Sequence, residues 1–150
     1  MSVALLVVRV LLAGAFGFAA YQKLIGPQAF AGAIKAFKTG IPDELIIKAA
    51  FMIPWAEAIA AASLLLGLWT RAGALLLSLA LLVFIGAIVS VIARGMTDVE
   101  CGCFGDYSWP CGVKVGWCQL WRNAVLIALT IAVVAAGPGR YSLDARLARQ

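Results

Sequence analysis

The sequence predicts an all-α fold, an integral membrane four-helix bundle, from its composition and its apolar stretches. Of the 150 residues, 64% are hydrophobic and only 13% are charged, and the mean hydropathy is +1.01. A soluble domain is closer to half apolar and a quarter charged. Four apolar stretches, at about residues 3–21, 45–68, 72–93 and 120–136, are long enough to cross a lipid bilayer. We expect residues 1–150 to form a single domain.

The first stretch and the segment after it predict one transmembrane helix and one interfacial helix. No positive charge precedes the apolar residues 3–21, as a cleavable signal peptide would require, so we expect an uncleaved span. Pro27 suits the first position of a helix, and Phe30, Ile34 and Phe37 then recur at helical spacing. This pattern predicts a short amphipathic helix lying on the membrane surface.

The other connections differ sharply in length. Because the turn around Trp69 and Arg71 is very short, the second and third spans should be antiparallel neighbours. Residues 94–119 form a cysteine-rich loop between the third and fourth spans. The fourth span should end at Gly137, where a polar tail begins.

Charge and composition exclude several classes of function. The net charge is +5, but the basic residues are spread along the chain and form no basic patch, so we expect no nucleic-acid partner. The chain contains no histidine. Its absence excludes histidine-based acid–base catalysis, histidine metal ligation, and Ser-His-Asp or Cys-His nucleophiles.

All four cysteines lie in the loop before the fourth span. Cys101 and Cys103 are separated by one glycine, so a disulfide between them would close a small, strained ring that favours exchange. We therefore predict Cys101 and Cys103 as the catalytic pair. Cys111 and Cys118 would be a second pair, either a shuttle that meets a partner or a structural staple. The sequence alone does not choose among the pairings that four cysteines allow.

Two other interpretations of the loop remain open. Extracytoplasmic cysteines usually form purely structural disulfides. Four thiolates can also bind zinc, but a Cys-x-Cys spacing does not match the usual zinc pattern, and a soft Cu(I) site held by cysteines is the other metal alternative. We predict no metal site.

A reactive cysteine needs a group that stabilises its thiolate. Arg122, followed by Asn123, stands at the start of the fourth span, where the helix end is also positive. These groups would stabilise a thiolate or a bound quinone oxygen. Three nearby acidic residues would oppose thiolate formation: Asp98, Glu100 and Asp106.

Two charges interrupt the apolar spans, Arg9 in the first and Glu57 in the second. An unpaired charge at such a position costs about 2.5–3.5 kcal/mol on insertion scales. Their depths along the helices differ by only ~6 Å, so we predict an Arg9–Glu57 pair or network. The pair would either fix the register of the helices or place Glu57 where it transfers protons or lines a ligand cavity.

Four crossings place both termini on the same side of the membrane. Disulfides persist outside the cytoplasm, so we predict cytoplasmic termini and a periplasmic cysteine loop in a bacterial inner membrane. The distribution of lysine and arginine is only suggestive of this orientation.

Several motifs, in order, resemble the MauE/DoxX family of small, redox-associated four-helix membrane proteins. The likeness covers nearly the whole chain, and its most specific part is Cys-Gly-Cys-Phe-Gly followed by Arg-Asn. The matching residues are Arg9, Lys23, Pro27, Phe30, Pro54, Glu57, the Leu-Leu-Gly before Arg71, residues 101–105, Arg122 and Asn123. Cys111 and Cys118 are extra to this pattern.

The resemblance implies thiol–disulfide or electron transfer at the periplasmic face. Proteins like MauE are linked to maturation of periplasmic methylamine dehydrogenase, and proteins like DoxX to sulfur-compound oxidation and quinone reduction. The leading hypothesis is a thiol–disulfide oxidoreductase that exchanges electrons between a periplasmic thiol or disulfide protein and a membrane acceptor. Quinone is the candidate acceptor, and no covalently bound cofactor is expected. The alternative is a non-enzymatic accessory or assembly subunit of a larger membrane complex, with a disulfide-stapled loop.

Overall fold

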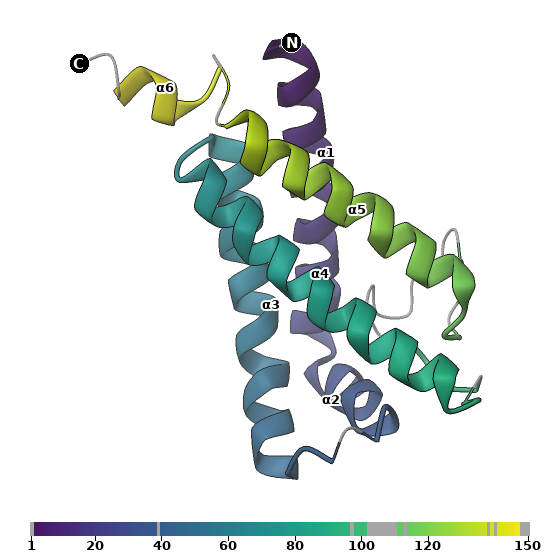
Figure 1. Cartoon of the computed structure of the whole chain (residues 1–150). Coiled ribbons are helices and arrows are strands. Elements are labelled where there is room, and N and C mark those ends of the chain that lie inside the picture. The colour runs from purple at the N-terminus through teal and green to yellow at the C-terminus, as the bar shows by residue number, and fades with distance from the viewer. Residues whose placement is uncertain are drawn as a thin grey trace.

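A computed structural model of the chain describes residues 2–38, 40–96, 98–101, 111–112, 114–137, 139 and 141–147. The helices within these ranges are shown in Figure 1: α1 (Ser2–Ile25), α2 (Pro27–Ala36), α3 (Asp43–Leu66), α4 (Thr70–Ala93), α5 (Trp117–Ala136) and α6 (Leu143–Leu147). Throughout the described part of the chain the only β pairing is one isolated bridge, between Glu100 and Lys114. The all-α prediction is confirmed.

The four predicted spans are confirmed, with shifted ends. Helices α1, α3, α4 and α5 are each long and apolar enough to cross a membrane. Helix α1 continues beyond residue 21 to Ile25 because Lys23 is buried inside the bundle and does not mark the membrane boundary. Helix α5 begins at Trp117, so the loop before it is shorter than the predicted residues 94–119.

The helices pack as two pairs joined by a tight turn. Helix α1 lies mainly against α3, and α4 lies mainly against α5 (Figure 1). Helices α3 and α4 are antiparallel neighbours, as predicted, but they diverge from their shared turn, and α2 lies at the open end of the angle between them. This divergence leaves space beside α2.

The turn between α3 and α4 depends on Gly67. This residue has a left-handed backbone, with φ of 71°. A Cβ built on Gly67 would meet Arg9 Nη2 and would lie 2.8 Å from Cα of Ser142. A side chain at this position would therefore be strained and would also collide with two other segments.

Buried apolar residues from all four long helices form the main core. Among them are Leu12, Phe16, Leu64, Leu77 and Val133. A polar contact joins the second pair of helices, where Ser78 Oγ donates to Thr130 Oγ1 at 2.9 Å. The outer surface bears many large apolar side chains, such as Leu11, Ile59 and Val83, which suits contact with lipid.

Helix α2 has the predicted amphipathic pattern. Phe30, Ala33 and Phe37 are buried, whereas Lys35 and Lys38 are exposed. Arg94, at the end of α4, donates from Nη2 to the Phe37 carbonyl at 2.7 Å. That bond satisfies a carbonyl at the C-terminal end of α2 and ties α2 to the start of the cysteine loop.

The polar tail predicted after Gly137 returns to the bundle. The Asp144 carboxylate accepts hydrogen bonds from the backbone amides of Trp69, at 2.8 Å, and Thr70, at 3.0 Å. In return, the Asp144 amide donates to the Gly67 carbonyl at 2.9 Å. The tail therefore caps the N-terminal end of α4, a contact that sequence periodicity does not predict.

Candidate functional site

A buried ion pair lies between the two helices of the first pair. Lys23 on α1 and Glu57 on α3 are each 3% exposed. Lys23 Nζ donates to Glu57 Oε1 at 2.8 Å and to Oε2 at 2.7 Å. Both carboxylate oxygens are thus engaged, and the two charges compensate each other in an apolar interior.

Two aromatic rings flank the Lys23 ammonium group. Nζ lies 5.1 Å from the ring centroid of Phe30 and 4.9 Å from that of Phe84. The two ring centroids are 6.3 Å apart. At these distances the rings attract the cation as well as enclosing it.

The predicted Arg9–Glu57 pair is wrong, because Lys23 takes the position beside Glu57. Arg9 instead donates to the Leu64 carbonyl, from Nε at 3.1 Å and from Nη2 at 2.9 Å. Lys23 lies about four helical turns after Arg9, on nearly the same face of α1. That spacing was a signal that both cations face α3, but the predicted end of the first span at residue 21 left Lys23 outside the helix.

Asn123, predicted as a supporting residue, faces the ion pair from α5. It is 2% exposed, and its side-chain nitrogen Nδ2 has no hydrogen-bond partner among the residues that the structure describes. A small cavity of about 20 Å³ is lined by residues from all four long helices: Phe16, Ala19, Lys23, Glu57, Leu81, Phe84, Asn123 and Leu126. An unsatisfied amide donor therefore borders a cavity that also touches the ion pair.

Arg122 lies next to Asn123 and is half-buried. Its guanidinium group is near enough to Lys23 to repel that ammonium electrostatically. The structure thus brings Arg122, Asn123 and Glu57 into one region, together with Lys23, whereas Arg9 lies at the other end of α1.

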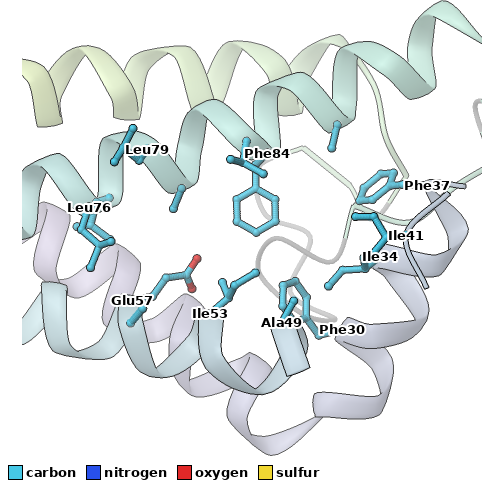
Figure 2. A pocket seen from close by; sticks show the side chains of 15 residues that line it. Phe30, Ile34, Phe37, Ile41, Ala49, Ile53, Glu57, Leu76, Leu79 and Phe84 are labelled. Carbon is cyan, nitrogen blue, oxygen red and sulfur yellow. The ribbon is translucent and has the colours of Figure 1, made fainter. Parts of the chain in front are cut away.

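A larger apolar groove of about 420 Å³ opens between α2, α3 and α4. Figure 2 shows Glu57 at one end, Phe37 and Ile41 at the other, and Phe84 between them. Among the described residues of the lining, Glu57 is the only charged one. These residues are Phe30, Ile34, Phe37, Ile41, Ala49, Ile53, Ala56, Glu57, Leu76, Leu77, Leu79, Ala80, Val83, Phe84 and Ala87.

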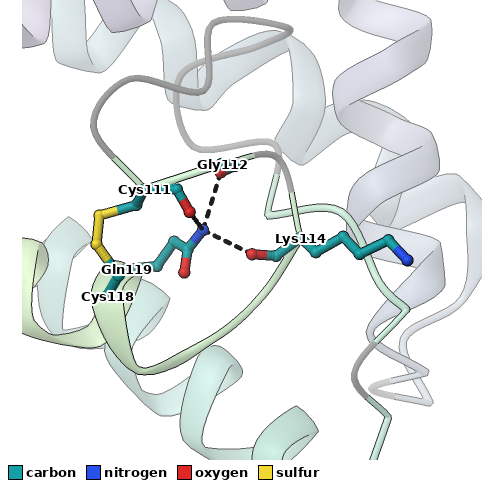
Figure 3. Close-up of a disulfide and its surroundings, with 5 residues drawn as sticks. All are labelled: Cys111, Gly112, Lys114, Cys118 and Gln119. Carbon is teal, nitrogen blue, oxygen red and sulfur yellow. Dashed lines mark hydrogen bonds between the residues drawn. A yellow bond between two sulfur atoms is a disulfide. The ribbon is translucent and has the colours of Figure 1, made fainter.

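The second cysteine pair is a disulfide between Cys111 and Cys118. Next to it, Gln119 is buried, and its Nε2 donates to the carbonyls of Cys111, at 3.0 Å, Gly112, at 2.9 Å, and Lys114, at 2.6 Å (Figure 3). This amide holds the loop across the disulfide. The sequence did not predict the Gln119 contact, because a glutamine in the first turn of a helix belongs to no recognisable motif.

The three described cysteines differ in the exposure of their side chains. Cys118 is exposed and Cys111 is half-buried, whereas Cys101 is only 5% exposed. Cys101 is itself disulfide-bonded. Cys103 lies outside the described residues, so the predicted Cys101–Cys103 pair stays a prediction.

Cys101 belongs to an apolar cluster between the loop and the bundle. The buried members are Phe37, Ile88, Val91, Cys101 and Val115, with Phe84 and Ala87 among the side chains packed against them. Three of these residues, Phe37, Phe84 and Ala87, also line the apolar groove. The disulfide at Cys101 therefore adjoins the end of the groove opposite Glu57.

The base of the loop is held by short polar contacts. The Val115 amide donates to the Val99 carbonyl at 2.8 Å, and Lys114 Nζ donates to Asp98 Oδ1 at 2.7 Å. The hydrogen bond and charge of Lys114 lower the pKa of Asp98, and Asp98 in turn raises the pKa of Lys114. Asp98 was expected to oppose a thiolate, but its charge is offset by Lys114. Asp106 lies outside the described residues.

Metal binding has no support in the described ranges. Among these residues, no three His, Cys, Asp or Glu side chains are placed to hold a metal ion. Since residues 102–110 lie outside these ranges, the expected absence of a metal stays a prediction.

Comparison with known proteins identifies the family. The family model described as methylamine utilisation protein MauE matches residues 1–136. The chain belongs to the MauE family. The methylamine utilization protein MauE of Paracoccus denitrificans is 33% identical over 132 residues, covering 87% of this chain and 68% of the relative. The protein of the same name from Paracoccus versutus is 35% identical with the same coverage. No solved structure matches the chain.

The MauE match ends where α5 ends, at residue 136. It includes the ion pair, Asn123, the groove and the cysteine loop. The segment that bears Asp144 and caps α4 lies beyond the matched residues.

Proposed function

We propose that this MauE-family protein is a membrane thiol–disulfide redox protein that serves methylamine utilisation. A periplasmic partner would exchange with the cysteine loop, and a membrane acceptor, a quinone, would take the electrons. The family membership supports the process, because the named relatives are methylamine utilization proteins. The four apolar helices support the membrane location.

The observation that best supports the redox proposal is the different exposure of the two disulfides. Cys118 is an exposed residue, which suits contact with another protein, and the buried Cys101 adjoins the groove within the bundle. Cys111–Cys118 therefore acts as the outer pair, and the disulfide of Cys101 as the inner pair. This order assigns to Cys111 and Cys118 the shuttle role that the sequence left open.

The electron balance of the exchange is simple. Two thiols of the partner become one disulfide and reduce the Cys111–Cys118 bond to two thiols. That dithiol reduces the inner disulfide in the same way. The inner dithiol then gives two electrons and two protons to the quinone, forming a hydroquinone and restoring the disulfide.

Trapping and redox measurements test the proposal. In the Cys118→Ser variant, the free Cys111 thiol should attack the disulfide of an oxidised partner protein and form a mixed disulfide, releasing one partner thiol. In a variant with all four cysteines changed to serine, no adduct should form. Both disulfides should titrate at potentials above about −300 mV, the range of exchangeable bonds. Two disulfides titrating well below that value, without adducts, would contradict the proposal.

The second candidate function is a non-enzymatic assembly subunit with a stapled loop. Its support is the Gln119 amide, which fixes the backbone around Cys111–Cys118 through three hydrogen bonds. In this case the Cys111→Ser/Cys118→Ser variant should have a less stable loop and should no longer assemble with its partner. Electron transfer should not change.

We place the termini in the cytoplasm and the cysteine loop in the periplasm of a bacterial inner membrane, because disulfides persist on that side. After mild reduction of spheroplasts, a membrane-impermeant maleimide should label Cys118. Labelling that requires lysis of the spheroplasts would reverse the orientation.

A further inference from the structure

The apolar groove and the small cavity at the ion pair adjoin each other, and we treat them as one candidate site. Glu57 and Phe84 line both the groove of about 420 Å³ and the cavity of about 20 Å³. The groove has a size typical of small-molecule sites, which span about 300–1,000 Å³. The small cavity has room for about one oxygen atom and no ring.

The small cavity contains hydrogen-bond donors that lack an acceptor. Asn123 Nδ2 is buried, and no described residue accepts a hydrogen bond from it. Lys23 donates to both oxygens of Glu57, and a lysine ammonium has a third hydrogen that finds no acceptor among the described residues. A buried donor without an acceptor is destabilising, so this arrangement favours a ligand oxygen that accepts from both groups.

The groove and the cavity together define the chemistry of the ligand. An acyl chain would fill the groove but would leave both donors unsatisfied. A water molecule would satisfy the donors but would not occupy an apolar groove of this size. A ring with a carbonyl oxygen and an apolar chain satisfies both requirements.

We propose that this groove binds an isoprenoid quinone, with one quinone carbonyl oxygen in the small cavity against Asn123 Nδ2 and Lys23 Nζ. The ring lies against Phe84, and the chain follows the apolar residues toward Phe37 and Ile41 (Figure 2). The site deepens the proposed function and rests on it for the choice of a redox lipid. Phe84 also packs against the cluster that contains Cys101, so one side chain would contact both the bound ring and the surroundings of the inner disulfide.

Equilibrium binding of decylubiquinone to the purified protein in nanodiscs, followed by quenching of tryptophan fluorescence, tests the site. The Asn123→Leu variant keeps the number and branching of the side-chain heavy atoms but removes the amide that would donate to the quinone carbonyl. We expect its affinity to fall about tenfold. The matched control is Thr130→Val. It removes a buried polar group from the same face of α5, two turns away and outside both cavities, and should leave the affinity unchanged.

Competition distinguishes a carbonyl ligand from an ordinary lipid. Decylbenzene, which has a similar ring and chain without carbonyl oxygens, should displace decylubiquinone poorly. Equal competition, or unchanged affinity in Asn123→Leu, would overturn the proposal and leave the groove as a lipid-chain site. Circular dichroism and unfolding measurements check that each variant folds. If Asn123→Leu fails to fold, Asn123→Asp provides a second test, and its affinity should also fall because a carboxylate repels the quinone oxygen.

The quinone site and the thiol chemistry can fail separately. The variant with all four cysteines changed to serine should bind decylubiquinone like the unaltered protein. Quinone binding without mixed disulfides would contradict only the redox function. Mixed disulfides and electron transfer that persist in Asn123→Leu with unchanged quinone dependence would contradict only the site.

Discussion

The two buried cations of α1 have very different surroundings. Arg9 donates to a main-chain carbonyl, that of Leu64, beneath the turn that the C-terminal segment covers. Lys23 pairs with a carboxylate, faces two aromatic rings and borders a cavity. A guanidinium presents a planar fork that can donate two hydrogen bonds to one main-chain carbonyl, whereas an ammonium is a compact charge, which Glu57 compensates here.

This difference indicates that the Arg9 end of α1 has a structural role, whereas the Lys23 end borders the candidate site. The Arg9 end is closed by Gly67 and Ser142, which approach one another too closely to admit a ligand. Lys23 borders the small cavity, and its partners Glu57 and Phe84 also line the groove. Variants at the two ends should therefore respond differently, and the largest response belongs to the ion pair.

Removing the counter-ion of Lys23 should be the most damaging change. Glu57→Leu leaves an ammonium buried without a carboxylate and should destabilise the protein by about 3–5 kcal/mol. The double variant Lys23→Met/Glu57→Leu should recover much of that loss, because no charge remains. Unfolding by denaturant in detergent micelles measures both. Equal stability of the single and double variants would contradict the burial of Lys23 beside Glu57.

Removing Arg9 should cost less than removing Glu57. The Arg9→Met variant leaves the neutral Leu64 carbonyl without this donor, a loss of about 1–3 kcal/mol. Quinone affinity should stay unchanged, because Arg9 lies far from the groove. The same unfolding and fluorescence assays measure both effects. A larger loss of stability in Arg9→Met than in Glu57→Leu would contradict this prediction.

A methyl group in the tight turn should disturb the Arg9 end alone. Gly67→Ala combines a left-handed backbone with contact against Arg9 and Ser142, and should destabilise by about 1–3 kcal/mol. Gly14→Ala is the matched control, since a Cβ there meets nothing within 4 Å. Thermal unfolding of the two variants should differ clearly. Similar stabilities would show that the turn relaxes.

The smallest predicted effect belongs to the cap from the C-terminal segment. Partial burial raises the pKa of Asp144, but the amides of Thr70 and Trp69 and the charge of Arg9 outweigh it and hold the pKa below its usual value. The cap is therefore fully present above the unfolded value of about 3.9 and is lost as the pH falls through the lower folded value. Asp144→Asn should cost about 0.5–2 kcal/mol at neutral pH and nothing at acid pH, as unfolding midpoints against pH would show. A cost independent of pH would contradict this account.

The fold was largely predictable because it depends on local signals. Apolar stretches of membrane length give α1, α3, α4 and α5, and Pro27 with the spacing of Phe30 and Phe37 gives α2. These features need only a few neighbouring residues to be recognised. The predicted end of the first span at residue 21 was too early. Lys23 continues the helix because it is buried against Glu57, which is distant in sequence.

The site was only partly predictable. Cys111, Cys118, Glu57, Arg122 and Asn123 were identified from residue type and motif, but their spatial grouping required the packing of four helices. The Arg9–Glu57 pair failed because depth along a helix does not choose between two cations on the same face. Asp144 was missed because it caps a helix about 75 residues earlier, and no periodic pattern marks such a contact.

The capping contact of Asp144 also implies a sequence of steps in the folding of the protein. A membrane protein is synthesised from its N-terminus, so α3, α4 and the turn at Gly67 leave the ribosome before the segment that covers them. Until Asp144 arrives, the first amides of α4 lack this partner. The final packing around Arg9 is therefore a late step of biogenesis, completed only after α5 has entered the bundle.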